Sequence, residues 1–510
     1  MNPYRCLRPN LANPTAFPKP RRGTQIRLDQ IRGLGDNFER LINTRSTAST
    51  APQNPSERGI GTATNSKAVS SSLWYAWYVV IVLMICYTLS FVDRQILSLM
   101  VGPIKRDLVI SDTEIGLLLG FAFAVFYTFA GLPLGRVVDT YGRRNPIAVG
   151  IFLWSIMTAL CSAARSYWTL FLARIGVGVG EAMLSPAAFS LISDYFPPEQ
   201  LGLAISVYTM GIFWGSGVAL AIGGTVVDVV MRMSAVHLPL LGAIATWRLS
   251  FLIVGLPGLL VTLLIFTVRE PLRKHVMRDT EGRVAHLSVG QVMTEINRRW
   301  QSFWGLAIGM VFQSLASYAF LSWAPAFFQR LHGWTAGQAG RALGVLVLLC
   351  GCLGMYVGGL LCDRWLGSGI AEGPLRVATI SAAGAGLFLG LALVMREAQA
   401  SLVLMAPGLF FQAMPIGTIY ASIQLIFPNQ IRGQVSALFM FILNFGGIGL
   451  GPLIPGLLND RLFRNEQMLG LSVAITLALA SVAMLVIIPA TYRPYRRDYR
   501  TQNSVARAQH

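Results

Sequence analysis

The sequence predicts an all-α membrane protein whose twelve transmembrane helices form two pseudo-symmetric six-helix bundles. Three observations support this fold class. Hydrophobic residues make up 54% of the 510 residues and charged residues only 13%. Apolar stretches of the length that crosses a bilayer recur along the chain, and two groups of motifs repeat between its halves. A soluble chain of this length needs more charged residues to cover its surface, so lipid is expected to surround most of this one.

The predicted spans form two groups of six, separated by a polar segment. Each is near the roughly 20 apolar residues that a helix needs to cross the hydrocarbon core. The twelve predicted spans cover residues 75–101, 114–136, 146–164, 168–196, 203–227, 249–268, 303–328, 340–361, 377–395, 402–427, 435–458 and 469–489.

The remaining segments complete the predicted organisation. Residues 1–72 are rich in Arg, Ser, Thr, Asn and Pro and contain no secretory hydrophobic region, so we expect a disordered cytosolic tail; an organelle transit peptide is the alternative. Residues 30–41 allow a short helix within this tail. The other predicted parts are an N-terminal bundle (73–268), a cytosolic linker (269–301), a C-terminal bundle (302–490) and a cytosolic C-terminal tail (491–510).

The distribution of Lys and Arg predicts the orientation. Of the 41 basic residues, 29 lie in the segments on the side of the two tails, 10 in the opposite loops and 2 within spans. Cytosolic loops carry the basic excess, so both termini are predicted to be cytosolic, most simply in the plasma (inner) membrane. The net charge of +18 is then a topology signal facing membrane lipid, and no nucleic-acid partner is expected.

Cysteine and histidine give no sign of a metal site. Most of the six cysteines lie within apolar stretches, and the five histidines are scattered over loops and the C-terminal tail. The chain also lacks a nucleophile elbow and a phosphate-binding glycine loop. We therefore expect no cofactor and no enzymatic activity.

Two sequence patterns recur between the halves. Gly135, Asp139 and the pair Arg143-Arg144 follow the second span, and 224 residues later Gly359, Asp363 and Arg364 follow the eighth. The segment 196–202 (FPPEQLG) opens the fifth span, and 427–433 (FPNQIRG) opens the eleventh, 231 residues on. Repeated halves around a midplane site are how many alternating-access carriers are built.

These patterns resemble the major facilitator superfamily. The resemblance rests on G-x-x-x-D-x-x-G-R-R after the second span, its G-x-x-x-D-R counterpart after the eighth, and the basic central linker, and it covers nearly all of residues 75–489. Within the superfamily, residues 91–95 (FVDRQ), 174–186, 193–197 (SDYFP) and 247–258 resemble Spinster-like transporters. Organic-anion symporters of the superfamily share the Asp-Arg pair of the first span.

Two positions depart from the superfamily pattern. Thr140 stands where Arg or Lys is usual, and Leu201 stands where a basic residue commonly opens the fifth span. Both changes remove a cation from the predicted cytosolic gate of the N-terminal half.

Four charged residues lie deep within predicted spans, namely Asp93, Arg94, Arg174 and Glu181. A charge near the bilayer centre costs several kcal/mol and therefore marks a function or an ion pair. Arg174 and Glu181 are two helical turns apart and share a face, whereas Asp93 and Arg94 point about 100° apart. We expect Arg94 and Glu181 to face a cavity, and Asp93 and Arg174 to lie in its wall or to pair across it.

The functional hypothesis for these charges is proton coupling. Glu181 and Asp93 would take up the proton, and Arg94, with Glu181 and Arg174, would contribute to a substrate-binding site. A substrate anion that engages Arg94 would free the carboxylate to accept a proton. The alternative is a static, neutral set of ion pairs that fixes helix register; for Arg174 alone, near the end of its span, this alternative is preferred.

Other residues complete the predicted sites. The superfamily resemblance implies a cytosolic gate, with Asp139, Arg143, Asp363 and Arg364 as its residues. In the C-terminal half the candidate substrate-binding side chains are neutral, namely Tyr318, Gln412 and Asn444, although most such residues serve helix packing. A cavity charged on one wall and apolar on the other fits an amphiphile, which agrees with the lipid-like cargo that the Spinster resemblance implies.

The sequence thus predicts a monomeric, proton-coupled secondary transporter of an amphiphilic or lipid-like organic molecule. A proton-coupled symporter of small organic anions is the alternative within the same class. A membrane receptor that keeps a carrier scaffold without transporting is the alternative from another class, because a fold does not fix a function.

Overall fold

The computed structural model describes residues 62–233, 236–238, 242–271, 289–428 and 431–508. The chain divides into two compact units, Met1–Ser66 and Lys67–His510. Residues 62–72, predicted to belong to the disordered tail, are instead helical and begin α2. The rest of that tail, with its predicted short helix at 30–41, lies outside the described residues.

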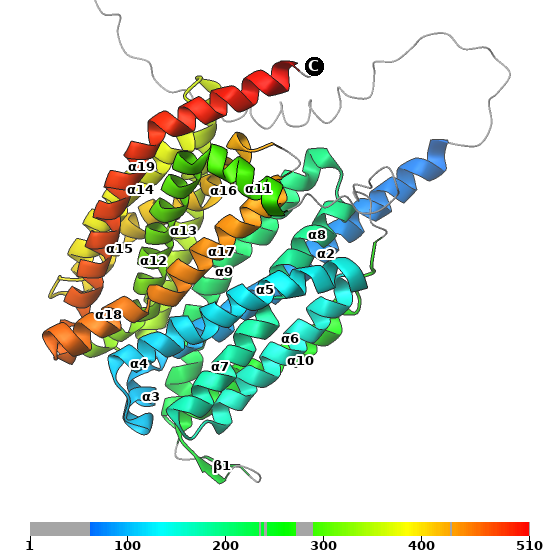
Figure 1. Cartoon of the computed structure of the whole chain (residues 1–510). Helices are drawn as coiled ribbons and strands as arrows, with labels where there is room; N and C mark the ends of the chain where they lie inside the picture. Colours follow the sequence, from blue (N-terminus) through cyan, green and yellow to red (C-terminus); the bar gives the residue numbers. More distant parts are fainter. Residues whose placement is uncertain (1–61, 234–235, 239–241, 272–288, 429–430, 509–510) are drawn as a thin grey trace, which may run out of the picture. The chain divides into compact units, whose positions relative to one another are not determined.

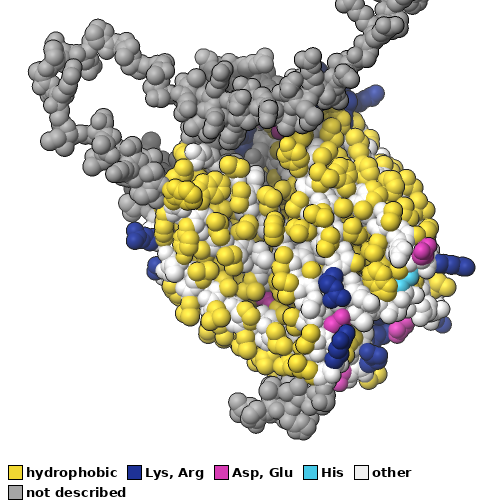
Figure 2. Space-filling model, turned by 180° about the vertical axis from the view of Figure 1, so that it is seen from behind, with side chains coloured by type: hydrophobic (Ala, Val, Ile, Leu, Met, Phe, Trp, Pro, Cys, Tyr) yellow, Lys and Arg dark blue, Asp and Glu magenta, His cyan; other side chains and the backbone are white. Residues whose placement is uncertain are grey.

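Twelve helices of the described chain are long and apolar enough to cross a membrane. Their outward side chains are largely hydrophobic, and Figure 2 shows these side chains covering most of the visible face, with acidic and basic groups mainly at the lower right and along the edges. The predicted fold class, an all-α bundle of twelve membrane spans, is confirmed.

The N-terminal half, residues 62–271, contains the first six spans. Its elements are α2 (Thr62–Leu99), α3 (Val101–Leu108), α4 (Asp112–Gly116), the π-helix η1 (Leu117–Phe121), α5 (Ala122–Tyr141), α6 (Arg144–Leu160), the 3-10 turn η2 (Cys161–Ala163), α7 (Tyr167–Glu181), α8 (Leu184–Tyr195), α9 (Pro198–Met231), the antiparallel strands β1 (Val236–Leu238) and β2 (Gly242–Ile244), and α10 (Thr246–Ile265).

The C-terminal half, residues 289–508, contains the other six. Its elements are α11 (Val289–Arg298), α12 (Trp300–Leu331), α13 (Ala336–Gly367), α14 (Gly373–Ala392), α15 (Ala398–Ala413), α16 (Pro415–Ile426), α17 (Arg432–Leu450), α18 (Leu453–Leu457), the π-helix η3 (Leu458–Phe463), the 3-10 turn η4 (Glu466–Met468) and α19 (Leu469–Ala508).

Most predicted spans match these helices to within a few residues, but the last does not. Hydropathy ends the twelfth span at 489, whereas α19 continues to Ala508. The continuation is rich in arginines and tyrosines, which lower hydropathy without breaking a helix, and the helix also passes through Pro489 and Pro494. The segment predicted as a C-terminal tail is therefore helical as far as residue 508.

Three spans begin at a capping box, a reciprocal pair of hydrogen bonds that satisfies free N–H groups at a helix start. Ser111 pairs with Glu114 before the second span, Ser166 with Thr169 before the fourth, and Thr335 with Gln338 before the eighth. All three caps lie at the end of the bundle opposite the C-terminal end of α19. We call this end the distal face and the other end the terminal face (Figure 1).

Close helix contacts join the two halves near the distal face. Spans five and eight cross at glycines: a Cβ added to Gly340 would lie 2.2 Å from the carbonyl oxygen of Leu220, and one added to Gly344 would lie 2.5 Å from that of Gly217. Spans two and eleven cross the same way, because a Cβ on Gly116 would lie 2.6 Å from the carbonyl oxygen of Pro452. Small residues at such crossings let membrane helices pack backbone to backbone.

An ion cluster around Asp112 strengthens this junction. The carboxylate of Asp112 is fully buried and accepts two hydrogen bonds of 2.7 Å from Arg330, one of 2.9 Å from Lys105 and one of 2.6 Å from Asn459. Asp460 in turn accepts the N–H and hydroxyl of Thr113 at the start of α4. Arg330, Asn459 and Asp460 belong to the C-terminal half, so the cluster bridges the halves.

Several further hydrogen bonds join the described parts of the two halves at the distal face. Besides the Asp112 cluster they join Gln329 to Leu99, Asp228 to Thr335 and Gly337, and Arg341 to Thr225. Figure 1 shows α5 and α17 close together toward α4 and α18 and diverging toward the terminal face. The two halves are therefore locked together at one face and separate at the other.

The Asp112 cluster is expected to control opening of the distal face. In a background without native cysteines, Ser216→Cys places a reporter on α9, where Ser216 lines a cavity that lies between the two halves. Asp112→Asn should raise the rate at which an impermeant maleimide labels it from the distal side by about tenfold or more, since a charge-assisted hydrogen bond contributes about 1.5–3 kcal/mol. Asp107→Asn is the matched control, because Asp107 binds Arg248 and Trp247 within the N-terminal half. Equal labelling in both variants would contradict the prediction.

At the terminal face, contacts fix the extension of α19 against the C-terminal half. Glu372, which precedes α14, is almost fully buried and accepts hydrogen bonds from Arg496 at 2.5 and 3.0 Å and from Arg376 at 2.9 Å. Tyr495 donates to the carbonyl of Ser422. Burial alone would raise the pKa of Glu372, but the hydrogen bonds from Arg496 and Arg376 lower it below its ordinary value.

Glu372 therefore makes stability depend on pH. A lowered carboxyl pKa stabilises the fold above the ordinary Glu value and loses this contribution as the pH falls through the folded-state pKa. Thermal unfolding of Glu372→Gln should begin several degrees below wild type at neutral pH, and the difference should shrink toward pH about 4. Glu397→Gln is the control, because Glu397 is the exposed N-cap of α15 and makes no side-chain cap bond. This substitution should leave the unfolding temperature unchanged. A difference that does not depend on pH would refute this account.

Candidate functional site

A buried ion pair joins the first and fourth spans near the middle of the N-terminal half. Nε and Nη2 of Arg94 in α2 donate to Oε2 of Glu181 at 2.8 and 2.5 Å. The Glu181 side chain is 1% exposed and that of Arg94 is 13% exposed. Oε1 of Glu181 accepts no hydrogen bond from the described residues. One carboxylate oxygen is thus committed to Arg94 and the other is unpartnered.

The position of Glu181 follows from a break in its span. The helix α7 ends at Glu181 and α8 begins at Leu184. The glycine at 178 lets the helix approach its neighbour, because a Cβ there would lie 2.6 Å from the carbonyl oxygen of Phe123. Glu181 therefore stands at a helix end beside a tightly packed crossing.

Aromatic rings surround the Arg94 guanidinium. Its Cζ lies 4.4 Å from the ring centroid of Phe123, 5.0 Å from that of Phe91 and 5.3 Å from that of Tyr127. Such cation–π contacts stabilise the positive charge where water is scarce. A cation held by rings on several sides and by one carboxylate oxygen can exchange the carboxylate for another anion without losing all of its partners.

Asp93 and Arg174 form a second layer behind this pair. Both are 1% exposed, and Nη1 of Arg174 donates to the backbone carbonyl of Asp93 at 3.2 Å. Oδ1 of Asp93 and Nε of Arg174 have no hydrogen-bond partner among the described residues. As predicted from their neighbouring positions, Asp93 and Arg94 do not face the same point, and only Arg94 keeps notable exposure.

The C-terminal half has a neutral counterpart of the ion pair. Gln412 lies 231 residues after Glu181, the same separation as between Phe196 and Phe427. It stands next to the break between α15 and α16, and its amide donates to the hydroxyl of Ser317 in α12 at 2.5 Å. The first and fourth helices of each half are therefore linked at corresponding places, by charges in one half and by an amide in the other.

A cavity of about 200 Å³ lies between the two halves. Its wall combines apolar side chains with neutral polar ones from both halves, and the described lining contains no charged residue. The residues that line it are Phe91, Ile212, Phe213, Ser216, Met310, Gln313, Ser314, Ser317, Tyr318, Phe320, Leu321, Val347, Gly351, Leu409, Gln412, Ala413, Ile416, Ile419, Tyr420, Leu443 and Asn444.

The predicted substrate-binding residues divide between two neighbouring places. Tyr318, Gln412 and Asn444 line the cavity together. Arg94 and Glu181 lie beside it, with Phe91 both in the cavity wall and against the Arg94 guanidinium. The four buried charges thus do not share one open chamber in this conformation.

Among the gate residues whose side chains are described, Arg143 is not joined to Asp363 or Arg364 across the halves. Arg143 is buried and binds Asp194 at the end of α8, and its Nε donates to Glu270 at 2.8 Å. All three belong to the N-terminal half. Asp363 and Arg364 are exposed at the end of α13, and no ion pair joins either to another described residue. Asp139 lies in α5, but its side chain is not among those described.

Glu270 accepts hydrogen bonds from both Arg143 and Arg144. Burial alone would raise its pKa, but the N–H groups of Arg144 and Arg143 and the Arg143 guanidinium lower the pKa below the ordinary Glu value. Sequence reasoning missed both Asp194 and Glu270 as partners. The signal was available, because both are acidic residues at span ends on the side where Arg143 lies.

The described ranges bring no three His, Cys, Asp or Glu side chains together as ligands for a metal ion. The chemistry of the site thus rests on two carboxylates, two guanidinium groups, hydroxyls and amides. Such groups can bind an organic molecule and exchange protons.

Comparisons with known proteins agree with this architecture. The family model described as the Major Facilitator Superfamily matches residues 83–452. An MFS-type efflux pump of Mycolicibacterium smegmatis is 31% identical over 442 residues, which is 83% of this chain and 94% of that protein. The human protein spinster homolog 1 is 27% identical over 434 residues, which is 81% of this chain and 78% of that protein.

A solved structure extends the similarity to three dimensions. The crystal structure of a bacterial homolog of the human lysosomal transporter Spinster, in an inward-facing and unoccupied conformation, matches with a TM-score of 0.69 and 25% identity over 84% of this chain and 98% of that chain. The family match, the twelve spans and the repeated halves lead to one conclusion: the chain belongs to the major facilitator superfamily of membrane transporters and is a Spinster-like member of it.

Proposed function

We propose that this transporter moves an amphiphilic organic molecule by alternating access, coupled to the movement of protons. The observation that carries the proposal is the pairing of an uncharged, largely apolar cavity with a buried Arg94–Glu181 ion pair at its side.

The cavity wall favours an amphiphile over a small, highly charged anion. Rings and aliphatic side chains provide most of the lining, and Gln313, Gln412 and Asn444 add amide groups. A small anion would lose its hydration in this cavity without meeting a cation in its described wall, which is costly. An amphiphile can instead place its apolar part in the cavity and its polar head toward Arg94.

The ion pair supplies a route to proton coupling. A substrate head that attracts Arg94 would leave Glu181 as a buried carboxylate without its partner. Burying an unpaired charge is unfavourable, so the carboxylate would take up a proton. Substrate and proton then occupy the site together, and their release restores the pair. Asp93, buried behind with an unpartnered oxygen, is a second candidate proton carrier.

The distal junction supports alternating access. It joins the halves through ion pairs and hydrogen bonds, which can break and re-form, whereas α5 and α17 diverge toward the terminal face (Figure 1). In the opposite state the proposed gate residues Asp139, Arg143, Asp363 and Arg364 would meet at the terminal face. The carboxylates of Asp194 and Glu270, which bind Arg143 in this structure, would then also contact the C-terminal half. Superfamily membership favours this carrier over a receptor that does not transport.

Replacing Glu181 tests the coupling. Protein in proteoliposomes should accumulate an NBD-labelled single-chain amphiphile when a pH gradient is imposed. Glu181→Gln should abolish the dependence on the gradient but retain exchange of the amphiphile between the two sides, because the site still opens to each face. Glu295→Gln, on α11 outside the spans, is the control. Proton-driven uptake that persists in Glu181→Gln would remove this residue from the mechanism.

Replacing Gln412 tests the cavity. Gln412→Ala removes the amide that links α15 to Ser317 and shapes the cavity wall, so KM for the amphiphile should rise by about tenfold, the effect of a lost hydrogen bond of about 1.4 kcal/mol. Gln424→Ala is the matched control, because Gln424 in α16 is exposed. Transport of gluconate but not of the amphiphile by wild-type protein would instead establish the organic-anion alternative.

A further inference from the structure

A second and larger hollow lies at the distal face. This recess has a volume of about 710 Å³, and its wall comes from the end of α2, from α3, from the ends of α9 and α12, and from the segment before α13. It therefore spans the junction of the two halves. None of its lining residues also lines the central cavity.

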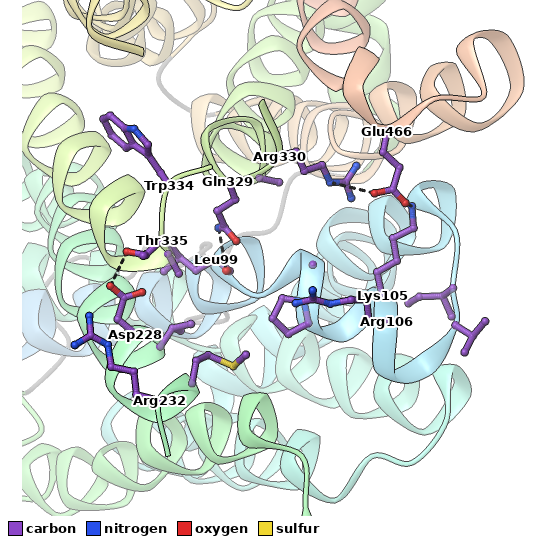
Figure 3. Close-up of a pocket in the computed structure, with 18 residues that line it drawn as sticks. Leu99, Lys105, Arg106, Asp228, Arg232, Gln329, Arg330, Trp334, Thr335 and Glu466 are labelled. Atoms are coloured by element: carbon purple, nitrogen blue, oxygen red, sulfur yellow. Dashed lines mark hydrogen bonds and ion pairs between the residues drawn. The ribbon is translucent and has the colours of Figure 1, made fainter. Parts of the chain in front are cut away.

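The recess is rich in cations. Lys105, Arg106, Arg232 and Arg330 line it, against Asp228 and Glu466 as its acidic residues (Figure 3).

Both carboxylates are already engaged. Asp228 accepts the hydroxyl of Thr335 at 2.7 Å and the N–H of Gly337 at 2.8 Å. Glu466 accepts a hydrogen bond of 2.6 Å from Lys105. Lys105 and Arg330 are also held by Asp112, so the partners of these two cations are accounted for.

Arg106 and Arg232 have no carboxylate partner among the residues that the structure describes. Both are exposed, and no ion pair joins either of them to another described residue. Figure 3 shows Arg232 with Asp228 on one side of the recess and Arg106 with Lys105 on the other, with Gln329 and Leu99 between them. A guanidinium group binds carboxylate and phosphate oxygens through paired N–H donors, so two such groups at one hollow suit an anionic ligand.

The rim adds apolar surface. Val109 is 89% exposed and lines the recess with Trp334 and Met231. Val109 also has a φ of 52°, a left-handed conformation that is unfavourable for a β-branched residue and would be relieved by glycine. The chain thus keeps an apolar side chain at a position where the backbone alone would favour none.

We infer that this recess is a binding site for an organic anion with an apolar body, separate from the central cavity. Its acidic group binds one of the two exposed guanidinium groups, Arg106 or Arg232, and its apolar part lies against Trp334, Met231 and Val109. The same chemistry is found in a soluble organic acid and in the anionic head of a lipid. The site does not depend on what the central cavity carries.

Binding of a matched pair of probes tests the site. Naphthalene-2-carboxylate carries the required charge and ring system, and naphthalene-2-carboxamide is its neutral analogue. Both are titrated by calorimetry into full-length protein in phosphatidylcholine nanodiscs. The carboxylate should bind at least about tenfold more tightly than the amide, and the double variant Arg106→Gln/Arg232→Gln should lose at least about tenfold in affinity for it.

Two controls give the test its specificity. Arg165→Gln/Arg396→Gln removes the same charge from exposed positions of the distal loops outside the recess, and it should leave the affinity within about twofold of wild type. Gln412→Ala should also leave the affinity for naphthalene-2-carboxylate unchanged, because Gln412 lines the central cavity and not the recess. The inference is overturned if the amide binds as tightly as the carboxylate, if both double variants weaken binding equally, or if Gln412→Ala abolishes it.

A lipid arm identifies the source of the anion. Part of the phosphatidylcholine is replaced by phosphatidylglycerol, and the titration is repeated. Weakened naphthalene-2-carboxylate binding to wild type that persists at high ionic strength, where surface charge is screened, assigns the site to a lipid head. Unchanged affinity assigns it to a soluble organic acid.

Discussion

A carboxylate buried in a helical membrane bundle needs cations or amides around it, and this requirement organises the structure at two places. Glu181 binds Arg94 within one half, and Asp112 binds Lys105, Arg330 and Asn459 across both halves. Removing one partner of such a cluster leaves an uncompensated charge in a poor solvent, which costs several kcal/mol. The first cluster can therefore respond to a ligand or a proton, and the second can hold or release the contact between the halves.

The two halves use one architecture for different chemistry. In each, the fourth helix of the bundle is interrupted and its broken end is linked to the first helix. The N-terminal link is the ion pair of Glu181 and Arg94, and the C-terminal link is the amide of Gln412 with Ser317. If the C-terminal link were also an ion pair, four charged groups would surround the cavity, and an apolar ligand would bind there less favourably. The neutral link keeps one wall available for apolar contact.

Much of the fold could be predicted from the sequence, because bilayer thickness dictates span length and the repeated motifs reveal the two halves. The importance of Arg94 and Glu181 could also be predicted, since few charges lie within the spans, but their direct pairing was not predicted. The Asp112–Arg330 contact could not, because its residues are 218 positions apart and lie at span ends, where charges are ordinary. The length of α19 was missed because hydropathy falls at its arginines although the helix continues. The break at Met414 directly precedes Pro415, a signal for a helix boundary that hydropathy does not record.

The interruptions of the fourth and tenth spans also bear on how the molecule moves. A continuous helix transmits a tilt along its whole length, whereas a helix broken at Glu181–Leu184 or at Met414 lets the segment on one side pivot while the other stays fixed. The segments α8 and α16 can then change their angle relative to α7 and α15, which stay fixed. Each conformational cycle would thus combine local bending at two hinges with the relative rotation of whole bundles, and the hinge at Glu181 would sense the charge state of the residue on which it turns.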